Sequence, residues 1–296
     1  MNAAAKLPET MTSQVLITGA AGKTGRAVIG ALLTRRAEMR ALVRRPEQAA
    51  ALRELGVTDV VVADLQDTNG LALAVQGTQS VYHICPNMHP DEFGIGCRMI
   101  AAAQSVGVSH FVYHSVLHPQ TEAMPHHWQK LRVEERLLES GLPFTILQPA
   151  PYMQNVLAHR PRIVDAGEYP VPYSAATRLA LVDLVDVGAA AATVLLEPGH
   201  TNAVYELVGE AALTQSDVAA ILSRELDRAV IVAEQSVEDW REQAEASGLD
   251  RYQVDTLARM FRYYDEYGLT GNSNVLRWLL GRPPTSFASF ARREFG

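Results

Sequence analysis

The stretch Val15-Leu16-Ile17-Thr18-Gly19-Ala20-Ala21-Gly22-Lys23-Thr24-Gly25 decides the fold predicted for this chain. It joins a short apolar run to an amphipathic helical pattern over residues 25–36 through three glycines spaced G-x-x-G-x-x-G. In such a loop Gly19 allows the tight turn from strand to helix, Gly22 lets the backbone approach a pyrophosphate, and Gly25 lets helix and strand pack closely. The N-terminus of the helix adds unpaired N–H groups and a favourable dipole for an anion. The stretch therefore predicts a phosphate-binding loop, with glycines that serve only a turn and a close helix contact as the alternative.

Outward from this loop, short β-branched runs alternate with longer helical patterns between residues 14 and 154. This alternation is typical of parallel strands joined by crossover helices. The strands are nearly continuous apolar runs, which indicates a sheet covered on both faces. The fold class predicted is α/β, a doubly wound parallel sheet of Rossmann type. The strands are expected at 15–18, 39–43, 60–63, 80–85, 110–115 and 144–148, with helices at 25–36, 47–56, 70–75, 94–106 and 128–140.

The rhythm changes after Pro149, where closely spaced prolines require loop and extended segments. One more unit is expected to return to the sheet, with a strand at 179–183, a helix at 187–196 and a strand at 203–208. The remainder reads as helical, including a capping box from Thr214 to Asp217. We expect a disordered tail at 1–13, a nucleotide-binding domain at 14–155 plus about 179–209, and a smaller, mostly helical domain for substrate or partner at 156–178 plus 210–296.

Composition excludes several classes of protein. The chain has 296 residues and a formal net charge of -7, which argues against direct nucleic-acid binding because that requires a basic face. The two cysteines cannot build a disulfide framework or a four-ligand zinc site, and no metal site is predicted. With two cysteines and no C-x-x-C, a reducing, cytoplasmic setting is expected. Residues 1–13 hold no apolar run long enough for a signal peptide or a membrane span.

The end of the second predicted strand indicates which dinucleotide is bound. It reads Val43-Arg44-Arg45-Pro46, with no carboxylate to bind ribose hydroxyls. A guanidinium matches phosphate oxygens with two parallel hydrogen bonds, so we assign Arg44 to the 2′-phosphate of NADP(H), assisted by Lys23. Arg45 is expected to be an ordinary solvated side chain.

Two further strand ends are expected at the same edge of the sheet. Asp64-Leu65 follows the third strand, where Asp64 either accepts a hydrogen bond from the adenine amine or serves, as Asp67 also could, as a helix cap. Cys85-Pro86 ends the fourth strand, and Cys85 is expected to be a small apolar wall residue.

Several motifs together resemble the NmrA-like branch of the atypical short-chain dehydrogenase/reductase superfamily. They are the glycine loop, Val43-Arg44, Asp64-Leu65, His126-His127-Trp128-Gln129-Lys130 with Glu134, the run from Leu147 to Asn155, the run from Ala180 to Val187, and the run from Tyr205 to Gly209. The likeness covers most of the chain.

The resemblance implies an NADP(H) domain, a smaller substrate domain and a cleft between them. It implies cofactor contacts from the glycine loop, including Ala21 and Thr24, from Lys130 on the ribose, and from the backbone of Pro149 to Tyr152 beside the nicotinamide. Two activities remain open. One is an NADPH-dependent reductase of a planar carbonyl, quinone or conjugated acceptor; the other is a redox sensor that binds NADP(H) without turnover and acts through a protein partner. A homodimer is also open.

Catalytic residues are less well indicated. Hydride-transferring members of the superfamily use Ser or Thr after the fifth strand and then Tyr-x-x-x-Lys, for which this chain offers Ser115 and Lys130 but has His126 at the tyrosine position. Either His126 donates a proton with its ordinary pKa near 6.5, or it belongs to a polar helix start. Asn155 either orients a substrate carbonyl or the nicotinamide amide, or caps a helix. Eight apolar residues either line a cleft or form core: Tyr152, Met153, Tyr169, Tyr173, Trp240, Phe261, Tyr263 and Tyr264.

Overall fold

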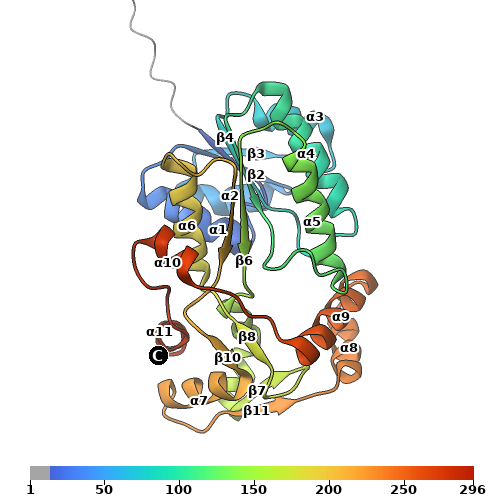
Figure 1. Cartoon of the computed structure of the whole chain (residues 1–296), viewed down its shortest axis with the longest axis vertical. Helices are drawn as coiled ribbons and strands as arrows, with labels where there is room; N and C mark the ends of the chain where they lie inside the picture. The colour runs from blue at the N-terminus through green and yellow to red at the C-terminus, as the bar shows by residue number, and fades with distance from the viewer. Residues whose placement is uncertain (1–13) are drawn as a thin grey trace, which may run out of the picture.

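A seven-stranded sheet, all of whose strand pairs are parallel, forms the centre of the computed structural model, which describes residues 14–296 (Figure 1). The tail predicted at 1–13 lies outside the described residues. The strand order is β3-β2-β1-β4-β5-β6-β9, and each β-strand of the first six is followed by a helical connection. The strands are β1 (Val15–Ile17), β2 (Met39–Val43), β3 (Asp59–Val62), β4 (Ser80–His83), β5 (His110–His114), β6 (Phe144–Pro149) and β9 (Ala203–Leu207).

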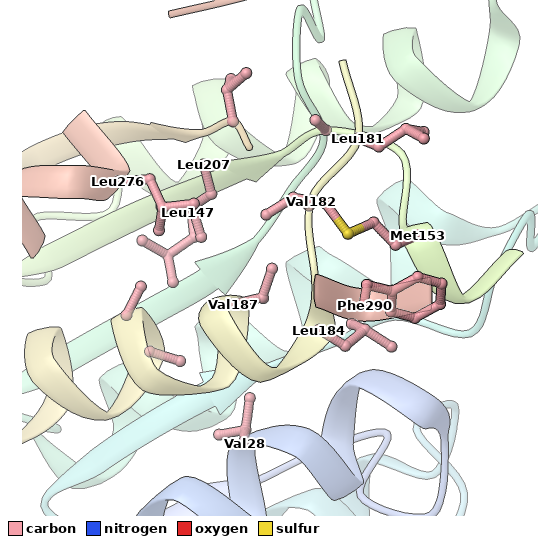
Figure 2. Packing of buried hydrophobic residues seen from close by; sticks show 14 of the residues in the cluster. Val28, Leu147, Met153, Leu181, Val182, Leu184, Val187, Leu207, Leu276 and Phe290 are labelled. Atoms are coloured by element: carbon pink, nitrogen blue, oxygen red, sulfur yellow. The ribbon is translucent and has the colours of Figure 1, made fainter. Parts of the chain in front are cut away.

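Helices cover both faces of the sheet, which confirms the predicted fold class. Successive strand side chains point to opposite faces, so Val15 and Ile17 join one buried cluster and Leu16 joins the other. In the first cluster Val28 and Val187 pack beneath the strands (Figure 2). The first face carries α1 (Lys23–Thr34), α2 (Pro46–Glu54) and α6 (Leu184–Leu196); the second carries α3 (Thr68–Val75), α4 (Glu92–Val106) and α5 (Pro125–Leu138).

The remaining elements lie beyond the carboxyl ends of the strands or beside α6 (Figure 1). Two small sheets form there, β8 antiparallel to β10 and β7 parallel to β11. The elements are the 3-10 helix η1 (Met153–His159), the π-helical turn η2 (Arg162–Ala166), β7 (Glu168–Val171), β8 (Arg178–Ala180), β10 (Ala212–Thr214), α7 (Gln215–Glu225), β11 (Ile231–Glu234), α8 (Val237–Ala246), α9 (Arg251–Tyr267), α10 (Asn274–Leu280) and α11 (Phe287–Phe295).

One topological prediction is wrong. The strand expected at 179–183 does not enter the main sheet, because β8 pairs with β10 and the Ala180 N–H donates to the Leu269 carbonyl at 2.7 Å. Only α6 and β9 of that unit return to the sheet. The strand β11 was not predicted, since four residues carry too little periodicity to mark a strand. The capping box is confirmed, with Thr214 Oγ1 accepting from the Asp217 N–H at 3.0 Å.

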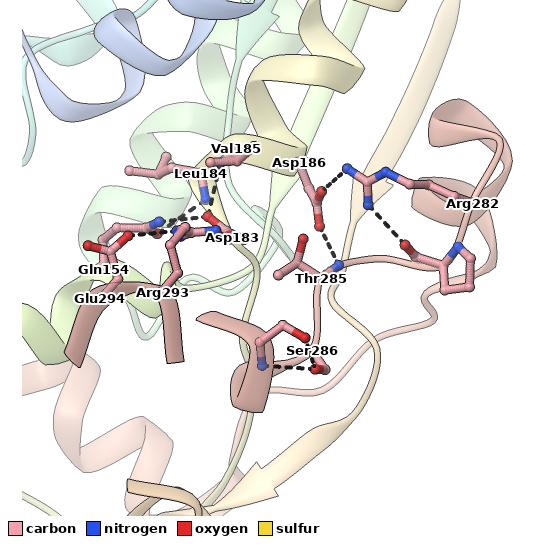
Figure 3. A network of polar contacts seen from close by, with 12 residues as sticks. Gln154, Asp183, Leu184, Val185, Asp186, Arg282, Thr285, Ser286, Arg293 and Glu294 are labelled. Carbon is pink, nitrogen blue, oxygen red and sulfur yellow. Dashed lines mark hydrogen bonds and ion pairs between the residues drawn. The ribbon is translucent and has the colours of Figure 1, made fainter. Parts of the chain in front are cut away.

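Two buried carboxylates tie the C-terminal segment to the start of α6 (Figure 3). Asp183 caps α6 and accepts from Arg293 at 2.8 Å. Asp186 accepts from Arg282 and from the Thr285 N–H, both at 2.6 Å. Since α10 also packs on α6, part of the predicted C-terminal domain lies against the sheet layer, and the domain boundaries stay a prediction. Over residues 14–296, no helix combines the length and the apolar character needed to cross a membrane.

Candidate functional site

A cavity of about 720 Å³ opens at the carboxyl edge of the parallel strands. Ligands of open α/β sheets bind at this edge, at the point where the strand order reverses. Here that point lies between β1 and β4, because β2 and β3 follow on one side of it and β5 and β6 on the other. Every site residue predicted from the sequence lines this cavity, while the role of each stays a prediction. They are Gly19, Ala21, Gly22, Lys23, Thr24, Gly25, Arg44, Asp64, Leu65, Cys85, Pro86, Ser115, His126, Lys130, Pro149, Tyr152 and Asn155.

The three loop glycines differ in what the fold requires of them. Gly19 has φ +60°, and a Cβ there would lie 3.0 Å from Ile84. A Cβ at Gly25 would lie 2.4 Å from the Gly19 carbonyl oxygen, so both glycines are needed for packing. Gly22 is exposed at φ -74°, and its Cβ would meet only one atom, 3.3 Å away. Packing alone does not explain Gly22, whereas a close approach by a phosphate at the start of α1 does.

Two cations beside this loop face solvent. Arg44 is exposed at the end of β2, and no acidic side chain within residues 14–296 forms an ion pair with it. Lys23 donates a long hydrogen bond of 3.5 Å to Asn155 Oδ1. An exposed guanidinium without a counter-ion suits the 2′-phosphate role predicted for Arg44.

The structure distinguishes between the alternatives predicted for Asp64, after β3, and describes the surroundings of Cys85, after β4. Asp67, rather than Asp64, caps α3 by accepting from the Asn69 N–H at 3.0 Å. Asp64 accepts only from the Gln66 N–H, at 2.8 Å, and lines the cavity. Cys85 is buried, and burial raises the pKa of its thiol, so it forms a neutral wall.

Lys130 lines the cavity and is held by a buried carboxylate. Its Nζ is 2.5 Å from Glu92 Oε1 and 3.4 Å from the His114 carbonyl oxygen. Burial alone would lower the pKa of Lys130, but the Glu92 carboxylate, together with Cys85 and Tyr152, outweighs this, and the pKa is raised. The ammonium is therefore charged and fixed in place. Glu92 was missed in the sequence because it lies 38 residues from Lys130.

Ser115 is committed to a different partner. Its hydroxyl donates to the buried Glu134 carboxylate, which also accepts two hydrogen bonds of 3.0 Å from Gln148. With its proton used in this way, Ser115 can only accept a hydrogen bond from a ligand. This arrangement makes it a weaker candidate for the catalytic role predicted from the superfamily pattern.

The two histidines that begin α5 are neutral. Burial lowers the pKa of His126 well below 6.5 and that of His127 to about 4. The predicted ordinary pKa of His126 is therefore wrong. His126 Nδ1 is buried without a hydrogen-bond partner among the described residues. Both rings line the cavity beside Lys130.

A chain of hydrogen bonds around Tyr152 was also missed. The Tyr152 hydroxyl lies 2.6 Å from His114 Nε2 and 3.2 Å from Thr24 Oγ1, and His114 Nδ1 lies 2.8 Å from the Tyr82 hydroxyl. The signal available in the sequence was only that His114 lies near the end of the strand predicted at 110–115. The strands bring together residues far apart in the chain.

The far end of the cavity is aromatic and uncharged. Edge-on contacts hold its rings, with centroids 4.7 Å apart for Trp240 and Phe261. Of the apolar residues left open by the sequence, Met153 and Tyr263 do not line the cavity. The far end is formed by side chains from β7 and β8 and from α8 and α9, among them Tyr169, Tyr173, Leu179, Trp240, Phe261 and Tyr264.

Comparison with known proteins places this architecture among reductases. The sequence profile of the NmrA-like family matches residues 11–285. The chain is 31% identical over 283 residues to quinone oxidoreductase 2 of Escherichia coli (strain K12), covering 95% of this chain and 98% of that protein. It is 28% identical over 280 residues to an NAD(P)H azoreductase of Xenophilus azovorans, covering 94% and 96%.

A solved structure extends the likeness to three dimensions. The NADPH-dependent quinone oxidoreductase of Escherichia coli complexed with NADPH superposes with a TM-score of 0.84 and 30% sequence identity. The match covers 95% of this chain and 100% of that one. The parallel sheet and the elements beyond its carboxyl edge are thus shared along nearly the entire length.

Proposed function

This chain belongs to the NmrA-like family, and we propose that it is an NADPH-dependent reductase that transfers hydride to a planar quinone, carbonyl or conjugated acceptor. One observation carries the proposal. A single continuous cavity runs from the glycine loop and Arg44, past the charged Lys130, to an uncharged aromatic end. A dinucleotide and a planar acceptor are the two ligands that these ends suit.

The residues present fit the dinucleotide. The open backbone at Gly22 leaves room that a Cβ would fill, and the first turn of α1 has no side-chain cap on its N–H groups. Arg44 and Lys23 supply positive charge for phosphate, and Lys130 suits the nicotinamide ribose. When bound, NADPH supplies the hydride.

The chain's own residues position the acceptor and stabilise charge. Glu92 holds the Lys130 ammonium at a fixed place in the cavity, so no reorganisation is required when negative charge develops on an acceptor oxygen. The aromatic end excludes water and presents flat apolar surfaces. These features favour neutral, planar acceptors over small charged ones.

The proposal is tested by anaerobic consumption of NADPH. We expect wild-type protein to oxidise one NADPH for each 1,4-naphthoquinone that it reduces. Absorbance at about 340 nm measures the NADPH, and chromatography measures the hydroquinone. Gly22→Asp should abolish this consumption. If the protein binds NADPH but reduces none of a panel of quinones, azo dyes and enones, the proposed reductase activity is contradicted.

That last result would favour the second candidate, a redox sensor without turnover. Its support is the missing tyrosine of the Tyr-x-x-x-Lys pattern and the commitment of Ser115 to Glu134. The sensor requires a protein partner whose binding changes between NADPH and NADP⁺, which pull-down under each form would measure. A homodimer stays a prediction.

A further inference from the structure

The hydroxyl of Tyr152 occupies a fixed position at the centre of the carboxyl edge. The backbone of this residue bridges to Val182, and the neighbouring Met153 N–H donates to the Val182 carbonyl at 3.0 Å. The side chain lines the cavity, and its hydroxyl lies between Thr24 of the glycine loop and His114 at the end of β5. The ring therefore connects the predicted dinucleotide loop with the wall that holds Lys130.

The direction of the hydrogen bonds follows from Tyr82. This residue is fully buried, and within residues 14–296 its hydroxyl has one hydrogen-bond partner, His114 Nδ1 at 2.8 Å. A buried O–H that donates to nothing is costly, so Tyr82 donates and Nδ1 accepts. The imidazole is neutral, because burial, reinforced by the Lys130 charge, lowers the pKa of His114 to about 3. Its one proton is therefore on Nε2.

This tautomer determines what Tyr152 can do. His114 Nε2–H donates to the Tyr152 oxygen at 2.6 Å, and Thr24 Oγ1 donates to it at 3.2 Å. Two incoming donors fill the lone pairs of the phenol oxygen. No acceptor for the Tyr152 O–H then remains among the described residues, and the proton is available to a ligand in the cavity.

We propose that the Tyr152 hydroxyl is the proton donor to the acceptor, in place of the tyrosine that the Tyr-x-x-x-Lys pattern lacks at residue 126. The inference rests on the proposed function. His114 and Tyr82 are positioning residues, because they aim this proton without touching the acceptor.

The step balances as follows. The acceptor gains a hydride, which carries two electrons, from the reduced nicotinamide dinucleotide. A carbonyl oxygen of the acceptor takes the proton of Tyr152 as the O–H bond breaks. Burial raises the pKa of Tyr152, and the phenolate left behind is stabilised against this by its two hydrogen bonds from Thr24 and His114 and by the Lys130 charge. Water entering the open cavity returns the proton. The products are the reduced acceptor and the oxidised dinucleotide.

The other candidate donors are less suitable. Ser115 gives its proton to Glu134, and the ammonium of Lys130 is held by Glu92. His126 is a neutral, buried imidazole, and proton donation from it would leave an imidazolate, a much stronger base than the phenolate of a tyrosine. Tyr152 combines a free proton with two donors for its anion.

The first test uses dinucleotide-free protein and does not depend on turnover. Equilibrium dialysis compares 1,4-naphthoquinone, whose carbonyl accepts a hydrogen bond, with naphthalene, which has no carbonyl. For Tyr152→Phe we expect the Kd of naphthoquinone to rise about threefold to tenfold, the loss of one hydrogen bond, with naphthalene unchanged. Tyr205→Phe, which removes a phenol oxygen on the edge strand β9 away from the cavity, is the matched control.

The second test measures turnover. Tyr152→Phe should lower kcat by about 100-fold or more while the Kd of NADPH changes less than threefold. His114→Leu, which leaves the hydroxyl but removes its alignment, should give a smaller loss of kcat. An unchanged naphthoquinone Kd, an equal change for naphthalene, or no binding by wild type would overturn the inference. If wild type consumes no NADPH, the proposed function fails, while the dialysis result still decides whether Tyr152 donates to a carbonyl.

Discussion

The two walls of the cavity treat charge in opposite ways. The glycine-loop wall, formed by residues 19–25 and Arg44, has exposed cations that lack acidic partners within the described chain. The β5 wall, formed by His114, Ser115, Lys130 and Tyr152 with Glu92 and Glu134 behind them, pairs the Lys130 ammonium with the buried Glu92 and satisfies the buried Glu134 through hydrogen bonds from Ser115 and Gln148. The cations of the first wall are left for a ligand to neutralise, whereas the charges of the second are already satisfied within the protein, and the Tyr152 proton is what it leaves for a ligand. Binding and proton chemistry are therefore separated in space.

The largest effect is expected from acid, which acts on His114 of the β5 wall and on the buried histidines His83 and His127 near it. Burial, with a contribution from Lys130, lowers the pKa of His83 and His114 to about 3, and burial lowers that of His127 to about 4. Unfolded histidine titrates near 6.5, so below this pH the unfolded chain binds protons that the folded chain does not. The contribution of these histidines to the free energy of unfolding is complete above pH 6.5. At pH 5 each of the three lowers the free energy of unfolding by about 2 kcal/mol relative to that value.

Urea unfolding at pH 7.5, 6 and 5 measures this loss. The free energy of unfolding should fall progressively below pH 6.5. A value that stays constant down to pH 5 would show that these histidines are not buried as neutral groups.

The next largest effect is expected from the ion pair behind Lys130. Glu92→Gln leaves a buried ammonium without its counter-ion, which should lower the free energy of unfolding by about 3–5 kcal/mol. The matched control is Glu197→Gln, because the Arg35–Glu197 pair has the same 2.5 Å separation but is about half exposed. Glu197→Gln should lower the free energy of unfolding by less than about 1 kcal/mol. Equal losses in the two variants would remove the contrast between buried and exposed charge.

A negative charge in the glycine loop tests the other wall. Gly22→Asp should weaken NADPH binding at least about 100-fold, because the new carboxylate would meet the phosphates, while its Cβ meets one atom, the Gly19 carbonyl oxygen at 3.3 Å. Gly30→Asp places the same charge on the outer face of α1, where a Cβ meets nothing within 4 Å, and should bind NADPH normally. Calorimetric titration of both variants measures this. The assignment fails if the two bind alike.

The smallest effect concerns the 2′-phosphate. Arg44→Ala should weaken NADPH binding about tenfold to 100-fold, the loss of a charge-assisted contact, and NADH binding less than threefold. Arg45→Ala is the neighbouring control, since Arg45 is exposed and does not line the cavity. Parallel titrations with both nucleotides report the difference. Equal losses for NADPH and NADH would exclude the clamp.

The same two walls explain how far the sequence could predict the site. The glycine-loop wall is local: seven consecutive residues and one strand end carry it, so a short motif was enough to find Gly22 and Arg44. The β5 wall depends on contacts across the sheet, such as Glu92 with Lys130 and Tyr82 with His114, which no spacing in the chain reveals.

The fold divides in a similar way. The strands of the main sheet were predictable because β-branched, apolar runs alternate regularly with helical patterns along that part of the chain. The strands β7, β8, β10 and β11 lie outside this alternation and pair across at least 30 residues, so they were misplaced or missed. For Tyr152 the sequence predicted a backbone contact beside the nicotinamide and a ring in a cleft or in the core, but no proton transfer, since the direction of its proton depends on two residues from other strands.

The most direct test of the account is the nucleotide preference of the wild-type protein. Titration with NADPH, NADP⁺, NADH and NAD⁺ in one buffer can be followed by tryptophan fluorescence, because Trp240 lines the cavity. We predict that the two phosphorylated forms bind at least about tenfold more tightly than the other two, with Arg44 as the discriminating residue. Equal affinity for NADPH and NADH, or no binding by any of the four, would contradict the account.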